Sequence, residues 1–304
     1  MAGTILITGG SGMIGKALTE LLLEKGYSVN HLSQNPRESQ LAGLKIFGWN
    51  VQEGTVDPAC LNNVSAVIHL AGENISKKPW TRKRRDEIVS SRTKSIELIY
   101  QLLHKEPQHN VQTVISASAS GYYGDRAEEV LTEESGPGEG FLSETTVAWE
   151  SAVQQSEDLS LRIVCLRTGV VLDRSNGALP QLEKPIKAGF AAPLGSGKQW
   201  VPWIHIKDLA RMYLFALETE HLKGAFNACA PQQITNEELT AAIRKHQGRS
   251  IPMPNVPAFL LRVVMGQMSE IVLASTRMSS YRIETSGFTF EFPTIQTALD
   301  DLYL

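Results

Sequence analysis

The sequence predicts an α/β protein built on a doubly wound parallel sheet, with a smaller C-terminal lobe on the substrate side. Three observations predict this fold class. Over the first 167 positions, short β-branched runs alternate with helically spaced apolar residues, which is the pattern of strands joined by crossover helices. Glycines connect the first run to the first helical stripe, and a segment rich in glycine and proline follows residue 168.

The elements of the first half are located by their own periodicity. Residues 4–8 predict a buried strand, and the apolar positions between residues 14 and 22 form one helix face that ends near Gly26. The other elements of this half follow the same two patterns: strands at 27–33, 66–70, 111–118 and 161–167, and helices at 81–104 and 143–155. We therefore expect five parallel strands before residue 168.

The second half changes character at residue 169. Residues 169–197 contain three prolines and five glycines, a composition that we expect of a substrate-side lobe. Thr235–Glu238 has the pattern of a capping box, and Asp208 is the expected N-cap of another helix. Further predictions are a strand at 225–228, helices at 208–217, 258–268 and 294–303, and a crossing marked by Ile251, Pro252, Pro254 and Pro257.

Composition and charge exclude several classes of protein. The 29 lysines and arginines against 32 aspartates and glutamates give a net charge of -3, so the basic excess that binds a phosphate backbone is missing and we expect no nucleic-acid partner. No apolar run approaches the ~20 residues of a membrane span, and no His/Cys pattern predicts a metal. Cys60, Cys165 and Cys229 form no CxxC pair and are odd in number, which favours a reducing, cytoplasmic location.

A glycine-rich turn joins the first strand to the first helix. Gly9, Gly12 and Gly15 are spaced as GxxGxxG: the first allows a sharp turn, the second lets the backbone approach a diphosphate, and the third lets the helix pack closely on the strand. The helix start adds free N–H groups and a positive dipole end. We predict a dinucleotide here, bound by Thr8, Gly9, Gly12, Met13, Ile14 and Gly15. The alternative is a glycine-rich turn with no ligand.

The end of the second strand bears on which dinucleotide binds. Proteins that prefer NAD place an Asp or Glu there to bond the adenosine ribose. This chain has no carboxylate at the strand end; Ser33 and Gln34 are hydrogen-bond donors, and Arg37 follows. A guanidinium pairs well with a 2'-phosphate, so NADP is predicted over NAD. Alternatively, Arg37 is a solvated loop cation.

At this point the chain resembles an extended short-chain dehydrogenase/reductase, from the superfamily of NAD(P)-dependent sugar-nucleotide epimerases and dehydratases. The resemblance is carried by the glycine turn and by the segments 69–74, 116–124, 166–172 and 203–210. Leu-Ala-Gly-Glu-Asn-Ile at 70–75, Trp-Ile-His-Ile at 203–206 and the tail from Ile251 resemble the branch labelled "epimerase family protein".

The resemblance implies a division of the chain and further cofactor contacts. Residues 1–168 would form mainly the NAD(P)-binding Rossmann domain, 169–250 a mixed substrate-side region with returning sheet elements, and 251–304 a family-specific C-terminal segment. The expected additional cofactor contacts are Leu70, Ala71, Gly72, Glu73, Asn74 and Arg92. Arg92 could equally be an exposed helix residue, and the basic cluster 82–85 predicts a solvated helix face or, alternatively, an anion site.

The superfamily's catalytic pair is missing. Ser118 sits where the family's serine belongs, and Glu150 matches the Glu that follows the Tyr-xxx-Lys element. Counting back from Glu150 gives Thr146 in place of the Lys and Leu142 in place of the Tyr, and neither can exchange a proton near neutral pH. The catalytic candidates are therefore Ser118 with Tyr122 or Tyr123; the alternative for both tyrosines is aromatic packing in the cleft wall.

We therefore expect an NADP-dependent oxidoreductase or epimerase-like enzyme with a degenerate Tyr-xxx-Lys site and a small-molecule substrate that the sequence does not identify. The alternative is a non-catalytic NADP-binding sensor or regulatory protein. We expect no nucleic-acid and no membrane partner, and a homodimer is compatible with the sequence.

Overall fold

A computed structural model describes residues 3–156, 159–189, 192–248 and 253–304 of the chain. Ile251 and Pro252 of the predicted crossing lie outside the described residues. The main sheet has eight strands in the order β12-β8-β6-β5-β1-β2-β3-β4. Its strands are β1 (Thr4–Thr8), β2 (Ser28–Ser33), β3 (Leu44–Asn50), β4 (Thr55–Val56), β5 (Val64–His69), β6 (Thr113–Ala119), β8 (Arg162–Thr168) and β12 (Gly224–Ala228). Neighbouring strands are parallel except for the antiparallel edge pair β3–β4.

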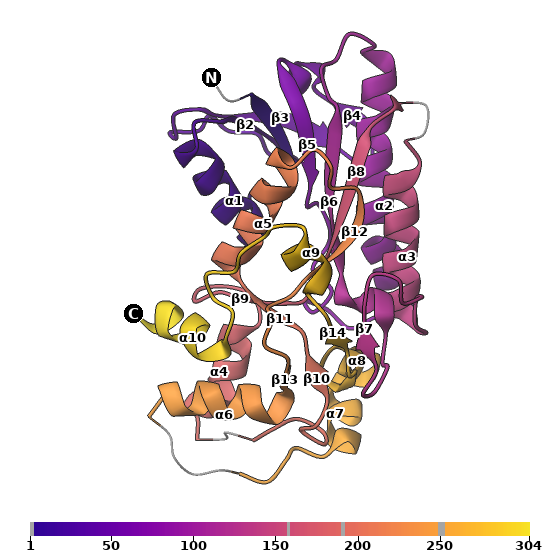
Figure 1. Cartoon of the computed structure of the whole chain (residues 1–304). Coiled ribbons are helices and arrows are strands. Elements are labelled where there is room, and N and C mark those ends of the chain that lie inside the picture. The colour runs from indigo at the N-terminus through magenta and orange to yellow at the C-terminus, as the bar shows by residue number, and fades with distance from the viewer. Residues whose placement is uncertain (1–2, 157–158, 190–191, 249–252) are drawn as a thin grey trace.

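Helices cover both faces of this sheet, as the doubly wound prediction requires (Figure 1). The helices α1 (Met13–Glu24) and α5 (Ile206–Glu218) pack together on one face, and α2 (Arg82–Lys105) and α3 (Phe141–Gln154) pack together on the other. The β-branched strand residues, such as Ile5, Ile7 and Ile68, are fully buried between the two layers. Burial on both faces explains why these strands read as continuous apolar runs.

The strand order reverses beside β1, and this fixes where a ligand binds. β1 lies between β5 and β2, and the ladder aligns Thr8 with His69 on one side and with Leu32 on the other. The carboxyl ends of the three strands are therefore level. In open α/β sheets, ligands bind at such a reversal, outside the carboxyl ends of the strands.

A smaller lobe lies below the carboxyl edge of the sheet in Figure 1. Its core is a separate apolar cluster that includes Leu179, Trp203, Leu239 and Leu299. The lobe and the segments that join it to the sheet comprise β7 (Val130–Leu131), β9 (Val170–Leu172), α4 (Leu179–Lys187), β10 (Trp200–Val201), β11 (Trp203–His205), β13 (Ile234–Thr235), α6 (Asn236–His246), α7 (Ala258–Met265), α8 (Glu270–Leu273), β14 (Arg277–Met278), α9 (Tyr281–Thr285) and α10 (Ile295–Tyr303). The predicted capping box of Thr235 and Glu238 is present at the start of α6.

Two elements differ from the prediction. β3 pairs in parallel with β2, but its residues are only partly buried, so the sequence lacks the apolar run that marks a central strand. Asp208 lies inside α5 rather than at its cap; its carboxylate accepts the Glu291 and Phe292 amides at 2.9 Å each. The cap is the buried His205, whose Nδ1 accepts the Lys207 amide.

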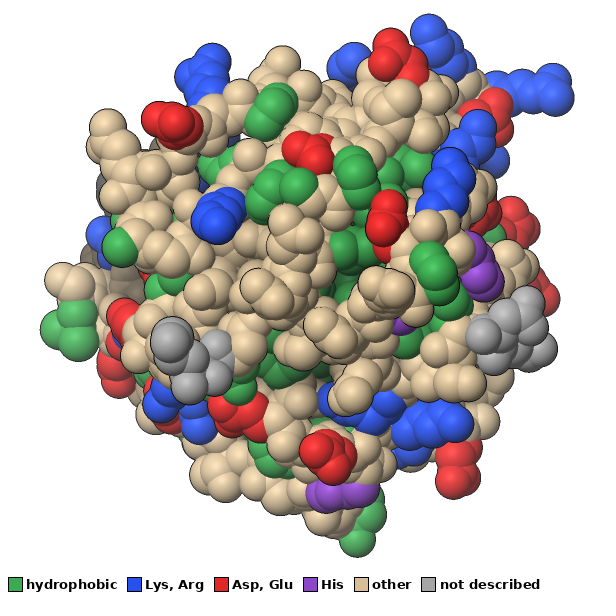
Figure 2. Space-filling view, turned by 90° about the horizontal axis from the view of Figure 1, so that it is seen from above, with side chains coloured by type: hydrophobic (Ala, Val, Ile, Leu, Met, Phe, Trp, Pro, Cys, Tyr) green, Lys and Arg blue, Asp and Glu red, His purple; other side chains and the backbone are tan. Residues whose placement is uncertain are grey.

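Charges of both signs are interspersed on the face seen from above in Figure 2. Lys and Arg side chains stand beside Asp and Glu side chains across this view, as the near-neutral total charge leads us to expect.

Buried histidines, among them His31 and His69, make the fold sensitive to acid. His31 hydrogen-bonds through Nε2 with the Thr19 hydroxyl, and His69 lies between the hydroxyls of Ser95 and Ser116. Burial lowers the pKa of His31 to about 4. Burial, together with the nearby positive charge of Arg92, lowers the pKa of His69 to about 3. Unfolded histidine takes up its proton below about pH 6.5. Between the folded and the unfolded pKa of each histidine, the unfolded chain binds more protons than the folded chain, so acidification favours unfolding.

We expect the free energy of unfolding to fall as the pH is lowered from about 6.5 towards 4, by about 3 kcal/mol for each buried imidazole. The measurement is urea unfolding at a series of pH values. His31→Gln should reduce the slope, whereas the same substitution at the exposed His221 should leave it unchanged. A slope that His31→Gln does not alter would contradict the assignment.

Candidate functional site

The glycine turn brings the start of α1 against the end of β1. Gly9 has φ of 71°, which few residues other than glycine adopt, and its carbonyl accepts the Gly12 amide at 3.0 Å. A Cβ on Gly15 would lie 2.5 Å from the Gly9 carbonyl oxygen, so only glycine allows this approach. No side chain caps α1, and its first turn has no acidic residue. The amides at Met13 and Ile14 therefore open onto a place suited to an anion.

Thr8 and Gly10 hold the turn in position. The Thr8 hydroxyl accepts the Leu70 and Ala71 amides at 3.1 Å each, which ties the end of β1 to the chain leaving β5. A Cβ on Gly10 would overlap the His31 imidazole on β2. The His31 side chain on β2 and the hydrogen bonds between Thr8 and the Leu70 and Ala71 amides thus hold the turn in place.

A groove of about 740 Å³ runs from the turn across the ends of β2 and β5. Six residues that the sequence predicted to bind the cofactor line it: Gly9, Ser33, Gln34, Ala71, Gly72 and Glu73. Ser11, Lys77 and Lys78 also line the groove and were not predicted. Arg37 is exposed and lines a neighbouring hollow together with Glu38, so the cations beside Ser33 and Gln34 in this groove are Lys77, Lys78 and Arg84.

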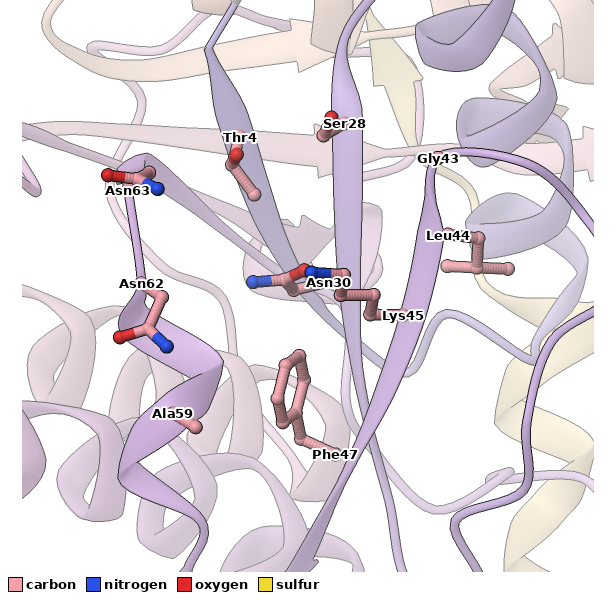
Figure 3. Close-up of a pocket in the computed structure, with 10 residues that line it drawn as sticks. All are labelled: Thr4, Ser28, Asn30, Gly43, Leu44, Lys45, Phe47, Ala59, Asn62 and Asn63. Carbon is pink, nitrogen blue, oxygen red and sulfur yellow. The ribbon is translucent and has the colours of Figure 1, made fainter.

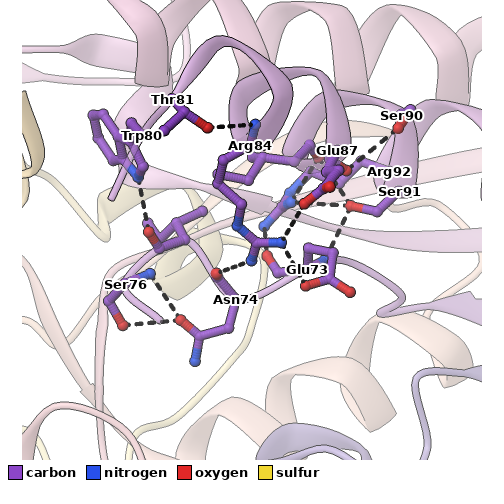
Figure 4. Close-up of polar contacts among 12 residues, drawn as sticks. Glu73, Asn74, Ser76, Trp80, Thr81, Arg84, Glu87, Ser90, Ser91 and Arg92 are labelled. Carbon is purple, nitrogen blue, oxygen red and sulfur yellow. Dashed lines mark hydrogen bonds and ion pairs between the residues drawn. The ribbon is translucent and has the colours of Figure 1, made fainter. Parts of the chain in front are cut away.

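The loop after β5 is fastened to α2 by Arg84 (Figure 4). Its Nη1 lies 2.9 Å from Glu73 and 3.0 Å from Glu87, and its Nη2 donates to the Asn74 carbonyl at 2.7 Å. Arg84 is 5% exposed. The predicted solvated face is therefore wrong at this residue, because the loop folds back over the helix and the guanidinium pairs with Glu73 of the loop and Glu87 of α2.

Asn74 has its partner within the same loop, and Arg92 has partners in this loop, on α2 and on α3. Asn74 Oδ1 accepts both the amide and the hydroxyl of Ser76. Arg92 donates to the carbonyls of Ile88 and Glu73, and its guanidinium lies 5.1 Å from the centre of the Trp149 ring. Burial lowers the pKa of Arg92 to about 10, so it remains charged near neutral pH.

A second cavity, of about 640 Å³, adjoins the groove at Arg92. Arg92 lines this cavity, and its guanidinium carbon lies 3.1 Å from where a Cβ on Gly72, in the groove, would be. Leu142 and Thr146, the residues at the positions of the expected Tyr and Lys, line the cavity wall on α3. Both side chains face the turn at Gly121.

Ser118 belongs to a buried polar network outside the cavity lining. Its hydroxyl donates to Glu150 at 2.5 Å, and Arg167 forms two hydrogen bonds to the same carboxylate, at 2.9 and 2.8 Å. Ser118 is 3% exposed. Its proton is therefore directed at Glu150, between β6, α3 and β8.

The two candidate tyrosines pack around the same arginine. The Tyr123 hydroxyl donates to Asn227 at 2.7 Å and accepts from Arg167 at 3.0 Å. Burial raises the pKa of the Tyr123 phenol to about 12, although Arg167 opposes the shift. The Tyr122 ring lies 3.4 Å from the Arg167 guanidinium carbon. Neither tyrosine is among the residues that line the cavity.

Sequence reasoning missed the polar residues that do line the cavity. Ser120 lines it from the 3₁₀ helix η2 (Ser120–Tyr123), Thr145 from α3, and Glu270 from α8. Thr145 is 5% exposed and its Oγ1 has no hydrogen-bond partner among the described residues. Ser120 follows the predicted Ser118 by two positions, whereas no motif marks Glu270.

A further hollow, of about 360 Å³, lies at the opposite edge of the sheet (Figure 3). Thr4, Ser28 and Leu44, at the amino ends of β1, β2 and β3, line one side, and Asn62 and Asn63 line the other. The glycine turn lies at the carboxyl end of β1, so this hollow is separate from the groove and the cavity.

The fold and the groove define a dinucleotide-binding protein of the Rossmann type with an adjoining cavity. The chain belongs to the NAD dependent epimerase/dehydratase family, whose model matches residues 5–229. Residues 256–302 match a domain of unknown function, DUF1731. The predicted branch of the extended short-chain dehydrogenases/reductases is thereby confirmed.

Its relatives extend over nearly the whole chain. It is similar to epimerase family protein YfhF of Bacillus subtilis, with 35% identity over 301 residues that cover 98% of this chain and 97% of the relative. It is similar in structure to human epimerase family protein SDR39U1, solved with NADPH, with a TM-score of 0.88, 31% identity and 99% of both chains covered. MoeE5, solved with UDP-glucuronic acid and NAD, shares the fold at 19% identity and a TM-score of 0.77, over 99% of this chain and 98% of that one.

Among the described residues, no helix has the length and apolar character needed to cross a membrane. No group of three or more His, Cys, Asp or Glu side chains in this part of the chain is placed to hold a metal ion.

The buried pair of Glu150 and Arg167 allows a direct test of the network around Ser118. Arg167→Met should leave the Glu150 carboxylate buried without its ion-pair partner and destabilise the fold by about 3–5 kcal/mol. The double variant Arg167→Met/Glu150→Leu should recover much of that loss, since it removes the unpaired charge. Urea unfolding measures both.

The exposed pair of Arg126 and Glu129 provides the control for this experiment. Arg126→Met should change the unfolding free energy by less than about 1 kcal/mol. A double variant at positions 150 and 167 that is no more stable than Arg167→Met alone would contradict the account of the network.

Proposed function

We propose that the protein is an NADP-dependent oxidoreductase or epimerase-like enzyme that acts on a small molecule in the cavity beside the groove. One observation carries this proposal: a groove that begins at the glycine turn meets a 640 Å³ cavity at Arg92 and Gly72. A nucleotide bound along the groove would bring its nicotinamide to this junction. When bound, the nicotinamide supplies hydride transfer.

The residues of the groove fit NADP. The turn offers unshielded amides to a diphosphate. At the end of β2 the groove is lined by Ser33, Gln34 and Asn35, with no carboxylate from that segment to repel a 2'-phosphate. Lys77 and Lys78 line the same groove. We assign them the attraction of the 2'-phosphate, in place of the exposed Arg37. The NADPH in the structure of the human relative supports this preference.

The cavity determines which hydroxyls reach a substrate. Ser118 and Tyr123 direct their protons into the buried network, whereas Ser120 and Thr145 line the cavity. We assign Ser120 the binding of the substrate's polar atom. Ser118, Tyr122 and Tyr123 hold α3 and the 3₁₀ helix in position through Glu150 and Arg167.

The second candidate function is a non-catalytic NADP-binding sensor. Leu142 and Thr146 in the cavity wall favour it, because neither side chain exchanges protons near neutral pH. Loss of turnover with intact cofactor binding in Ser120→Ala would favour the enzyme. Cofactor binding without NADPH oxidation against any carbonyl or sugar-nucleotide substrate would favour the sensor.

In either case a cytoplasmic location is part of the proposal, supported by three buried free thiols.

Cofactor binding is tested by calorimetric titration with NADPH and NADH. We expect NADPH to bind the wild type at least about tenfold more tightly. Gly12→Val should weaken the binding of both nucleotides by more than about tenfold, because the valine side chain would occupy the diphosphate cradle. The φ of Gly12 is an ordinary -73°, so the backbone accepts the valine. Lys77→Gln/Lys78→Gln should weaken NADPH alone, because NADH lacks the 2'-phosphate.

Two matched variants control for these changes. Gly136→Ala should leave both affinities unchanged, since a Cβ there meets no atom within 4 Å. Lys223→Gln removes an exposed cation that does not line the groove, and NADPH affinity should persist. Binding of neither nucleotide by the wild type would overturn the proposed function, and equal affinity for both would overturn the preference for NADP.

A further inference from the structure

The hollow at the amino edge of the sheet has no part in the proposed function (Figure 3). It lies between the amino ends of β1, β2 and β3 on one side and the 3₁₀ helix η1 (Pro58–Leu61) with the residues after it on the other. Polar side chains predominate among the described residues that line it: Thr4, Ser28, Asn30, Lys45, Asn62 and Asn63.

Asn30 is the buried polar residue of this hollow. It is 4% exposed, and its Nδ2 donates to the Cys60 carbonyl at 2.8 Å. That bond identifies the other end of the amide as the acceptor, because a carbonyl oxygen cannot donate. The Asn30 Oδ1 receives no hydrogen bond from the described residues, and it is not among the unpaired polar atoms that the protein encloses completely. Buried acceptors are normally paired, so we expect a molecule in the hollow to supply the donor.

The neutral polar side chains around Asn30 are also uncommitted. The hydroxyls of Thr4 and Ser28 and the side-chain amides of Asn62 and Asn63 form no hydrogen bond with the described residues. Hydroxyls and amides can both donate and accept. They therefore match a ligand whose own groups do both, and a hydroxylated carbon chain has that property.

Lys45 gives the hollow a positive charge. Among the described residues that line it, Lys45 is the only charged one, and its ammonium forms no ion pair within that part of the chain. Figure 3 shows its side chain reaching from β3 towards Asn30, its cross-strand partner on β2. Arg37 and Glu38 line an adjoining hollow that shares Lys45, and their charges cancel. The lining therefore favours a carboxylate over an ammonium group.

We propose that this hollow is a second ligand site, which binds a small hydroxylated carboxylate of the sugar-acid type. Lys45 pairs with the carboxylate, the Asn30 Oδ1 accepts from a hydroxyl, and the Phe47 ring, which also lines the hollow, packs against the C–H groups of the ligand. The donor to Asn30 is a hydroxyl rather than an ammonium group, because Lys45 repels a second cation. The hollow lies at the amino end of β1 and the glycine turn at its carboxyl end, so this ligand and a nicotinamide nucleotide bind without competing.

Three probes of equal carbon number separate the two kinds of contact. D-gluconate has a carboxylate and hydroxyls, sorbitol has only hydroxyls, and hexanoate has only a carboxylate. Each is titrated calorimetrically into the full chain at neutral pH and low salt. We expect gluconate to bind more than about tenfold more tightly than hexanoate, which offers no donor to Asn30. It should bind at least about threefold more tightly than sorbitol, a modest factor because Lys45 is exposed, and about 1 M NaCl should remove that advantage.

Variants of the hollow locate the binding site. Lys45→Gln should lower the affinity for gluconate to that for sorbitol and leave sorbitol unchanged, because only the charged probe loses its partner. Asn62→Ala should weaken gluconate and sorbitol alike, because it removes an amide and no charge. Lys223→Gln and Asn110→Ala are the matched controls, since both residues are exposed and do not line the hollow.

The inference is overturned if gluconate gives no binding, if hexanoate or sorbitol binds as tightly as gluconate at low salt, or if Lys45→Gln leaves the preference for gluconate intact. Lys45 and Asn62 are both exposed, so we expect their variants to fold, and titration with NADP⁺ checks each one. A chain that binds NADP⁺ but not gluconate refutes only this inference, whereas a chain that binds gluconate but no nicotinamide nucleotide refutes only the proposed function.

Discussion

The buried ion pair of Glu150 and Arg167 is the interaction on which the substrate side depends. The two side chains join α3 to β8, and through Ser118 and Tyr123 they also hold the end of β6 and the 3₁₀ helix that follows it. Desolvating two charges is costly unless their hydrogen bonds are satisfied. Here the carboxylate receives three and the guanidinium also contacts an aromatic face. With this network in place, one face of α3 is free to form the cavity wall.

The cofactor side and the substrate side obtain their geometry in different ways. At the groove, the backbone determines the shape: Gly9 and Gly15 allow an approach that any side chain would block. At the cavity, side chains from distant segments determine it, since η2, α3, β10 and the segment 270–276 all contribute. The C-terminal segment is also attached to the sheet side, where β14 pairs with β7 and the Asn227 amide donates to the carbonyls of Leu131 and Ser279.

The sequence predicted the sheet and the turn because both are encoded locally. A strand buried on both faces produces an apolar run, and GxxGxxG between a strand and a helix predicts a tight turn with close helix–strand packing. The cavity is different. Ser118 and Ser120 differ by two positions, and only the point where β6 ends decides which one is buried. Lys77 and Lys78 reach the groove because Arg84 folds their loop onto α2, and Glu270 reaches the cavity from a segment more than a hundred residues beyond α3. None of these placements has a periodic signal.

The loss of the Tyr and Lys pair restricts the site without making it chemically inert. A Tyr phenolate needs a nearby cation to lower its pKa, and such a cation would also neutralise carboxylates in the cavity. With Leu142 and Thr146 in those positions, Asp125, Glu139 and Glu270 remain unneutralised by any described lining cation except Arg92, which is bound to carbonyls of its own loop and helix.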